Sequence, residues 1–154
     1  MKCLGITKKI AITSGFGESD TSKLNAFDNA LIDAGIHDCN LIKVSSILAK
    51  NTKITKKFMI EKGSFVPCVL STQNGLKKEI ICSGIGIGFN NQKYGFVMEA
   101  KGKNENKVTT VLEKKLGEMA KNRKQKIIQK KIITKKAKIN KKYGCVITAV
   151  IYLF

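Results

Sequence analysis

Residues 24–48 read LNAFDNALIDAGIHDCNLIKVSSIL, and this stretch predicts a helix, a turn and an extended segment in close succession. The helix is predicted over residues 22–34, because Ser22 is a favourable N-cap and Gly35 is typical of the position just after a helix. Its apolar side chains recur at helical spacing, at Leu24, Phe27, Ala30, Leu31 and Ala34. Residues 39–48 are predicted to be extended, with a break at the two serines.

Further strands and one more helix are predicted outside this stretch. A helix is expected over about 105–125, where apolar residues share one face, and the motif GFGESD (15–20) is expected to form a turn. Grouped strands around two helices favour an α+β fold in layers. Runs rich in apolar and β-branched residues predict strands at 9–14, 64–71, 79–89, 94–100, near 132–139 and at 144–153.

The length and charge of the chain limit its organisation and its partners. A chain of 154 residues is expected to form a single domain over residues 1–154. Its 29 basic and 11 acidic residues give a net charge of +18, and 16 of the basic residues lie after residue 100. Such a basic region is compatible with nucleic-acid binding. It is equally compatible with a solvated lysine surface, because Arg123 is the single arginine.

Cysteine usage favours reduced thiols and a cytoplasmic protein. The five cysteines form no C-x-x-C motif, and the chain has one histidine, His37, so we expect neither a disulfide framework nor a metal site. The start of the chain lacks the apolar core of a signal peptide, and the apolar run 145–154 is too short to span a bilayer. The cysteines are Cys3, Cys39, Cys68, Cys82 and Cys145.

Two glycine clusters do not match a nucleotide-binding loop. Gly15-Phe16-Gly17 is followed by Asp20 where a dinucleotide-binding fingerprint needs Gly or Ala. The run 84–88 alternates glycine with isoleucine inside an apolar segment, a pattern typical of close packing.

Two acidic residues are better functional candidates. Asp28 lies at the edge of the apolar stripe of the first helix, and Glu99 follows the apolar run 96–98. A carboxylate beside apolar residues needs a partner, so Asp28 would bind a cationic ligand or pair with a boundary lysine. Glu99 is compatible with a general acid and with an ordinary glutamate at a strand end.

Several motifs together resemble the pyruvoyl-dependent arginine decarboxylase family. LNAFDNAL (24–31) is similar to the family's L-N-A-F-D-x-A-L helix, and NLIKVSSI (40–47) is similar to its self-cleavage site. The resemblance continues, in the same order, to the C-terminus through GSFVP (63–67), YGFVMEAKGK (94–103) and YGCVITAV (143–150).

This resemblance implies an enzyme that makes its own cofactor and is cleaved into two chains. The hydroxyl of Ser46 would attack the carbonyl of Ser45, releasing residues 1–45 as a β chain. Residues 46–154 would form an α chain headed by a covalent pyruvoyl group derived from Ser46, with neither pyridoxal phosphate nor a metal. Asn40 matches the family asparagine that assists the cleavage.

The resemblance also implies a substrate, roles for the two acids and an assembly. The enzyme would convert L-arginine to agmatine and carbon dioxide, an activity of polyamine biosynthesis or acid resistance. Glu99 matches the family's general acid, and Asp28 matches the residue that binds the substrate guanidinium. The implied fold is an αββα sandwich, assembled as a homotrimer with active sites between neighbours.

Two alternatives stay open from the sequence. The same chemistry would serve another cationic amino acid, such as lysine or ornithine. A non-enzymatic module that binds nucleic acid through the lysine-rich region 101–142 would leave the chain uncleaved.

Overall fold

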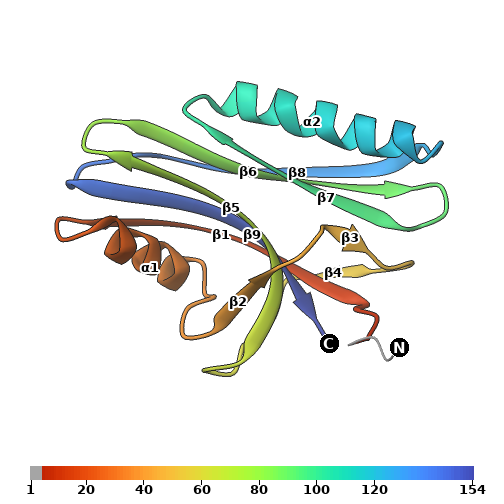
Figure 1. Ribbon diagram of the computed structural model, residues 1–154, viewed down its shortest axis with the longest axis horizontal. Coiled ribbons are helices and arrows are strands. Elements are labelled where there is room, and N and C mark those ends of the chain that lie inside the picture. The colour runs from red at the N-terminus through yellow and green to blue at the C-terminus, as the bar shows by residue number, and fades with distance from the viewer. Residues whose placement is uncertain (1–4) are drawn as a thin grey trace.

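The computed structural model describes residues 5–154 and has an α+β fold of two sheets and two helices in four layers (Figure 1). Helix α1 (Lys23–Asp33) covers a five-stranded sheet, and helix α2 (Glu105–Asn122) covers a four-stranded sheet. The two sheets pack against each other between the helices. The layer order therefore corresponds to the expected αββα sandwich.

The five-stranded sheet has the order β2-β5-β9-β1-β4, and the four-stranded sheet has the order β3-β7-β6-β8. The long central strands pair antiparallel, whereas the short strands β2 and β4 pair parallel with their neighbours. The strand bounds are β1 Lys9–Ser19, β2 Asn40–Lys43, β3 Ile47–Leu48, β4 Lys53–Thr55, β5 Phe65–Leu76, β6 Ile80–Asn90, β7 Gly95–Gly102, β8 Ile127–Lys138 and β9 Tyr143–Leu153.

The main core lies between the two sheets. Because side chains alternate along a strand, the central strands bury one set of residues between the sheets and the other set beneath a helix. Strand β9 confirms the strand predicted at 144–153 and is buried along nearly its whole length. The core between the sheets includes Ile10, Val69, Ile85, Val97 and Val150.

Helix α1 packs directly on the backbone of β1, and this packing corrects one prediction. The residues GFGESD were expected to form a turn, but Gly15-Phe16-Gly17 continues strand β1. A Cβ atom at Gly15 would come within 2.1 Å of the carbonyl oxygen of Ala30, and one at Gly17 within 2.3 Å of that of Ala26. Glycine is required here so that helix and strand can approach closely, and the turn begins only after Ser19.

The predicted helix 22–34 is confirmed, with one error on its apolar face. The Ser22 side chain accepts the backbone N–H of Asn25, as expected for an N-cap, and Gly35 adopts a positive φ of 69°. Leu24, however, was placed on the buried stripe, and its side chain is 75 % exposed. Ala26 is buried against β1 in its place, because only a small side chain fits that close contact.

Other boundaries differ more modestly from the prediction. Strand β5 runs to Leu76 and therefore extends beyond the predicted end at residue 71, and β8 begins at Ile127 rather than near 132. The short strand β4 had no clear pattern in the sequence. Helix α2 is confirmed. Its apolar face is narrower than the sequence suggests, because the apolar residue Val111 is 41 % exposed.

The described cysteines are free thiols, as predicted, and Cys3 lies outside the described residues. Burial raises the pKa of Cys68 to about 11 and that of Cys145 to about 12, so both thiols stay protonated at neutral pH. Among residues 5–154, neither helix combines the length and the apolar composition that crossing a membrane requires.

Candidate active site

The two adjacent serines lie in the loop between β2 and β3, at the point where the chain leaves one sheet and enters the other (Figure 1). Strand β2 pairs with β5 in the five-stranded sheet, and β3 pairs with β7 in the four-stranded sheet. Ser45 is exposed and Ser46 is half-buried. A short loop between two sheets therefore holds the Ser45–Ser46 peptide bond.

The backbone of Ser46 has an unusual and well-anchored conformation. Its φ is 72°, in the left-handed region that costs a residue with a Cβ atom about 1–2 kcal/mol. The backbone N–H of Val97 in β7 donates to the carbonyl oxygen of Ser46 over 2.9 Å. The pairing of β3 with β7 thus holds Ser46 in a strained conformation.

A buried tyrosine holds the next residue. The hydroxyl of Tyr152, in β9, donates to the carbonyl oxygen of Ile47 over 3.3 Å. Tyr152 is 8 % exposed, and burial raises its pKa to about 12, so the phenol remains a hydrogen-bond donor. Tyr152 and both serines line a cavity of about 400 Å³.

Glu99 shares a second cavity with Ser46. This cavity of about 430 Å³ lies between β7 and α2 and is lined by Ser46, Val97, Met98, Glu99, Lys115, Glu118, Met119 and Asn122. Glu99 follows Val97 by two residues in β7, so both side chains lie on the same face of the strand. The strand that anchors Ser46 therefore also positions Glu99 beside it.

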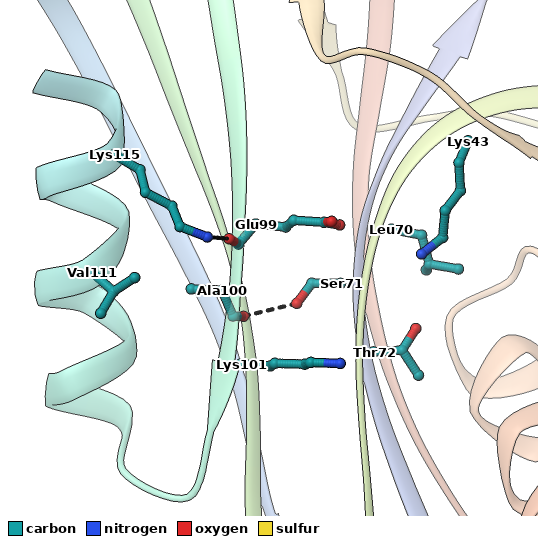
Figure 2. A pocket seen from close by; sticks show the side chains of 9 residues that line it. All are labelled: Lys43, Leu70, Ser71, Thr72, Glu99, Ala100, Lys101, Val111 and Lys115. Carbon is teal, nitrogen blue, oxygen red and sulfur yellow. Dashed lines mark hydrogen bonds between the residues drawn. The ribbon is translucent and has the colours of Figure 1, made fainter. Parts of the chain in front are cut away.

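Glu99 also borders a third cavity, of about 300 Å³, between β7 and β5 (Figure 2). The ammonium group of Lys115 donates to the backbone carbonyl oxygen of Glu99 over 2.7 Å, and the hydroxyl of Ser71 donates to that of Ala100 over 2.8 Å. The cavity is lined by Lys43, Leu70, Ser71, Thr72, Glu99, Ala100, Lys101, Val111 and Lys115, so its charged groups are three lysines and one glutamate.

Two of the predicted site residues lie elsewhere in the protomer. Asp28 is exposed on α1 and lines none of the three cavities near the serines. Asn40 is at the start of β2, and its side-chain amide donates to the carbonyl oxygen of Gly63 over 3.0 Å. The structure brings Ser45, Ser46 and Glu99 together around two cavities that share Ser46, and leaves Asp28 and Asn40 outside them.

Three contributors were missed from the sequence. Tyr152 looked like part of an apolar strand, and the N–H of Val97 is a backbone group that no motif reveals. Lys115 has the same character in the sequence as the other lysines of α2. These three residues share one property, which is that each lies next to Ser46, Ile47 or Glu99, and only the fold reveals that proximity.

Part of the lysine-rich region is engaged in ion pairs on the surface. Lys130 pairs with Glu113 at 2.6 Å, and Lys136 pairs with Glu105 at 3.3 Å. These contacts link β8 to α2 across the outer layer of the molecule. Some of the excess charge therefore serves a solvated surface, as one of the two sequence interpretations expected.

Comparisons with known proteins show which family the chain resembles. Residues 9–154 match the family model described as pyruvoyl-dependent arginine decarboxylase. The chain is similar to the pyruvoyl-dependent arginine decarboxylase of Methanothermobacter thermautotrophicus, with 48 % identity over 95 residues, 61 % of this chain and 62 % of the relative. It is also similar to that of Methanopyrus kandleri, with 39 % identity over 132 residues, 85 % of this chain and 86 % of the relative. The protein of the same name from Methanocaldococcus jannaschii is 35 % identical over 118 residues, 73 % of this chain and 67 % of the relative.

Proposed function

This chain belongs to the pyruvoyl-dependent arginine decarboxylase family, and we propose that it converts L-arginine to agmatine and carbon dioxide with a pyruvoyl group made from Ser46. One observation carries the assignment of the site. Ser46 is held at a positive φ by the N–H of Val97, and it borders the same cavity as Glu99.

The surroundings of Ser46 fit a pyruvoyl group. The group replaces the amino and hydroxymethyl substituents of the serine with a ketone and a methyl group, so it is no larger than the serine. The hydrogen bonds from Val97 and Tyr152 reach the carbonyl oxygens of residues 46 and 47, which the conversion leaves in place. Ser46 is half-buried and borders two cavities, so the ketone has access to a substrate.

Self-cleavage starts at the Ser46 hydroxyl. The oxygen attacks the carbonyl carbon of Ser45, an ester forms, and the Ser45–Ser46 peptide bond breaks. Elimination then releases the carboxylate of Ser45 and leaves a double bond at residue 46, whose hydrolysis releases ammonia and yields the ketone. The strained φ of Ser46 supports this assignment, because breaking the peptide bond relieves that strain.

The pyruvoyl group supplies a ketone that binds the α-amino group of the substrate and accepts the electron pair left by departing carbon dioxide. The chain's own groups support that chemistry. The N–H of Val97 donates to the carbonyl oxygen next to the ketone and stabilises negative charge that develops there. Glu99 donates a proton to the former α-carbon, as a general acid positioned beside residue 46.

Asp28 binds the substrate guanidinium, since a carboxylate matches its planar donors. Within one protomer Asp28 is exposed and borders none of the cavities next to Ser46, so it acts in the site of a neighbouring protomer. We therefore propose active sites between protomers, and the family resemblance implies that the assembly is a homotrimer. Exposed apolar side chains on α1 and near the serines support such contacts, namely Leu24, Ile32, Ile42, Val44 and Ile47.

Asn40 assists the cleavage by fixing the strand that leads to the serines. Its side-chain amide donates to the carbonyl oxygen of Gly63 and its backbone N–H donates to that of Ser64, so the start of β2 is tied to the loop that precedes β5. Free thiols at the described cysteines support a cytoplasmic location for the enzyme.

Intact mass spectrometry followed by an amine-release assay tests the function. The purified protein is expected to give two fragments, residues 1–45 and residues 46–154 with a blocked N-terminus. It is expected to release agmatine from arginine and much less amine from lysine or ornithine. An uncleaved chain that decarboxylates arginine would overturn the pyruvoyl assignment, and preference for lysine would change the substrate. Salt-sensitive nucleic-acid binding by an uncleaved, inactive chain would support the alternative binding module.

A further inference from the structure

We propose that the cavity between β7 and β5 is a subsite for the α-carboxylate of the substrate, formed by Lys43 and Lys101 beside Glu99. The inference rests on the proposed decarboxylase function. It assigns a place to the group that leaves as carbon dioxide.

The position of Glu99 indicates where the α-carboxylate of the substrate lies. A general acid that protonates the former α-carbon must contact that carbon, and the carboxylate is bonded to the same carbon. The carboxylate therefore lies in a space that Glu99 borders. Glu99 borders two cavities, one shared with Ser46 and one between the sheets.

The charges distinguish these two cavities. The cavity shared with Ser46 contains a second acid, Glu118, which repels a carboxylate. The cavity between the sheets contains Lys43 and Lys101 and has Glu99 as its one acid. Lys115 borders both cavities and is held at the backbone of Glu99. An anion is therefore favoured on the side of Lys43 and Lys101.

Lys43 and Lys101 are available for a ligand. Among the described residues, neither ammonium group forms an ion pair or a hydrogen bond with a side chain, whereas Lys103, two residues beyond Lys101, pairs with Glu79 at 2.7 Å. Figure 2 shows the side chains of Lys101 and Glu99 extending in the same direction from β7 toward β5, and Lys43, which also lines the cavity, lies beyond β5. Thr72 is another lining residue of this cavity.

These lysines affect substrate binding more than the chemical step. The carboxylate loses its charge as carbon dioxide forms, so an ammonium group stabilises the bound substrate more than the transition state. Removing the charge therefore raises KM and does not lower kcat. This also explains how a strongly basic protein accepts arginine: the lysines match the carboxylate end of the amino acid, and Asp28 matches its guanidinium.

Methionine substitutions test the subsite, because methionine keeps much of the aliphatic stem and removes the charge. Lys43→Met and Lys101→Met are each expected to raise KM for arginine roughly tenfold, with kcat per pyruvoyl group changed less than about twofold. The inhibition constant of agmatine, which has no carboxylate, is expected to stay unchanged. Lys114→Met is the matched control, since Lys114 is exposed on α2 and lies outside the cavity.

A pair of substrate analogues gives a second measurement, whose first part uses only the wild-type enzyme and so does not depend on self-cleavage of a variant. The wild-type enzyme is expected to bind 5-guanidinopentanoic acid more tightly than pentylguanidine, which lacks the carboxylate, and Lys101→Met is expected to remove that difference. Unchanged KM in the Lys43/Lys101 double variant, or equal weakening of arginine and agmatine, would overturn the subsite. A wild-type chain that stays uncleaved and inactive would instead overturn the proposed function.

Discussion

The backbone N–H of Val97 lies 2.9 Å from the carbonyl oxygen of Ser46, and Glu99 follows Val97 by two residues on the same face of β7. The short pairing of β3 with β7 therefore holds Ser46 at a fixed place along β7, two residues from Glu99. This relationship defines the proposed site. Ser46 and Glu99 are 53 positions apart in the sequence and are brought together through the pairing of β3 with β7.

Ser46→Ala is expected to abolish self-cleavage and activity, because only the side-chain oxygen of residue 46 forms the ester and leaves in the elimination. Ser45→Ala keeps the attacked carbonyl and is expected to be cleaved, at a changed rate. Denaturing gels and intact mass distinguish the two variants. Cleavage of Ser46→Ala at the same bond would contradict the proposed mechanism.

Glu99→Gln is expected to lower kcat per pyruvoyl group by roughly 10²–10⁴-fold, the range for loss of a general acid. The amide has nearly the same shape, so cleavage and folding are expected to persist. Steady-state kinetics normalised to the pyruvoyl content measures the effect. Glu118→Gln, in the same cavity, is the control and is expected to retain most of the activity.

Asp28→Asn is expected to raise KM for arginine at least tenfold, because a neutral amide replaces a charge-assisted contact to the guanidinium. Asp33→Asn on the same helix is the control, since its side chain accepts the backbone N–H of Phe16 within the protomer. Light scattering is expected to show a trimer for both variants. An active monomer would contradict the placement of Asp28 in a neighbour's site.

Tyr152→Phe is expected to slow self-cleavage roughly tenfold, because it removes the hydrogen bond that holds the carbonyl of Ile47 next to the scissile segment. Tyr143→Phe, in the same strand, is the control, because no hydrogen bond of the Tyr143 hydroxyl is found among the described residues. The rate is followed on denaturing gels of freshly purified precursor. Equal slowing in both variants would indicate a general loss of stability instead.

Gly17→Ala is expected to lower the free energy of unfolding by about 2–3 kcal/mol, through a Cβ atom that meets the backbone of α1 at 2.3 Å. Gly117→Ala is the opposite case, since a Cβ atom there meets nothing within 4 Å and alanine favours a helix. Gly117→Ala is expected to add roughly 0.5–1 kcal/mol. Chemical denaturation measures both, and equal effects would contradict the close packing of α1 on β1.

Local signals carried much of the prediction. Helix α1 followed from its N-cap, spacing and terminal glycine, and β9 followed from an uninterrupted apolar run. The family resemblance identified the serine pair and the two acids, because those motifs are short and contiguous. The strand across Gly15 and Gly17 was missed, because the same glycine pattern occurs in turns and in closely packed strands.

The sequence by itself predicted the groups proposed for the chemistry of this protein, namely the hydroxyl of Ser46 and the acids Asp28 and Glu99, and the elements that carry them. Only the tertiary structure decided how these groups meet. The pairing of β3 with β7 joins Ser46 to Val97 and Glu99, the last strand brings in Tyr152, and the packing of the two sheets turns three of many lysines toward one cavity. The physical reason is that hydrogen bonding and packing between distant segments depend on the register of their strands. The pattern of one strand alone does not specify which distant strand it pairs with or in which register.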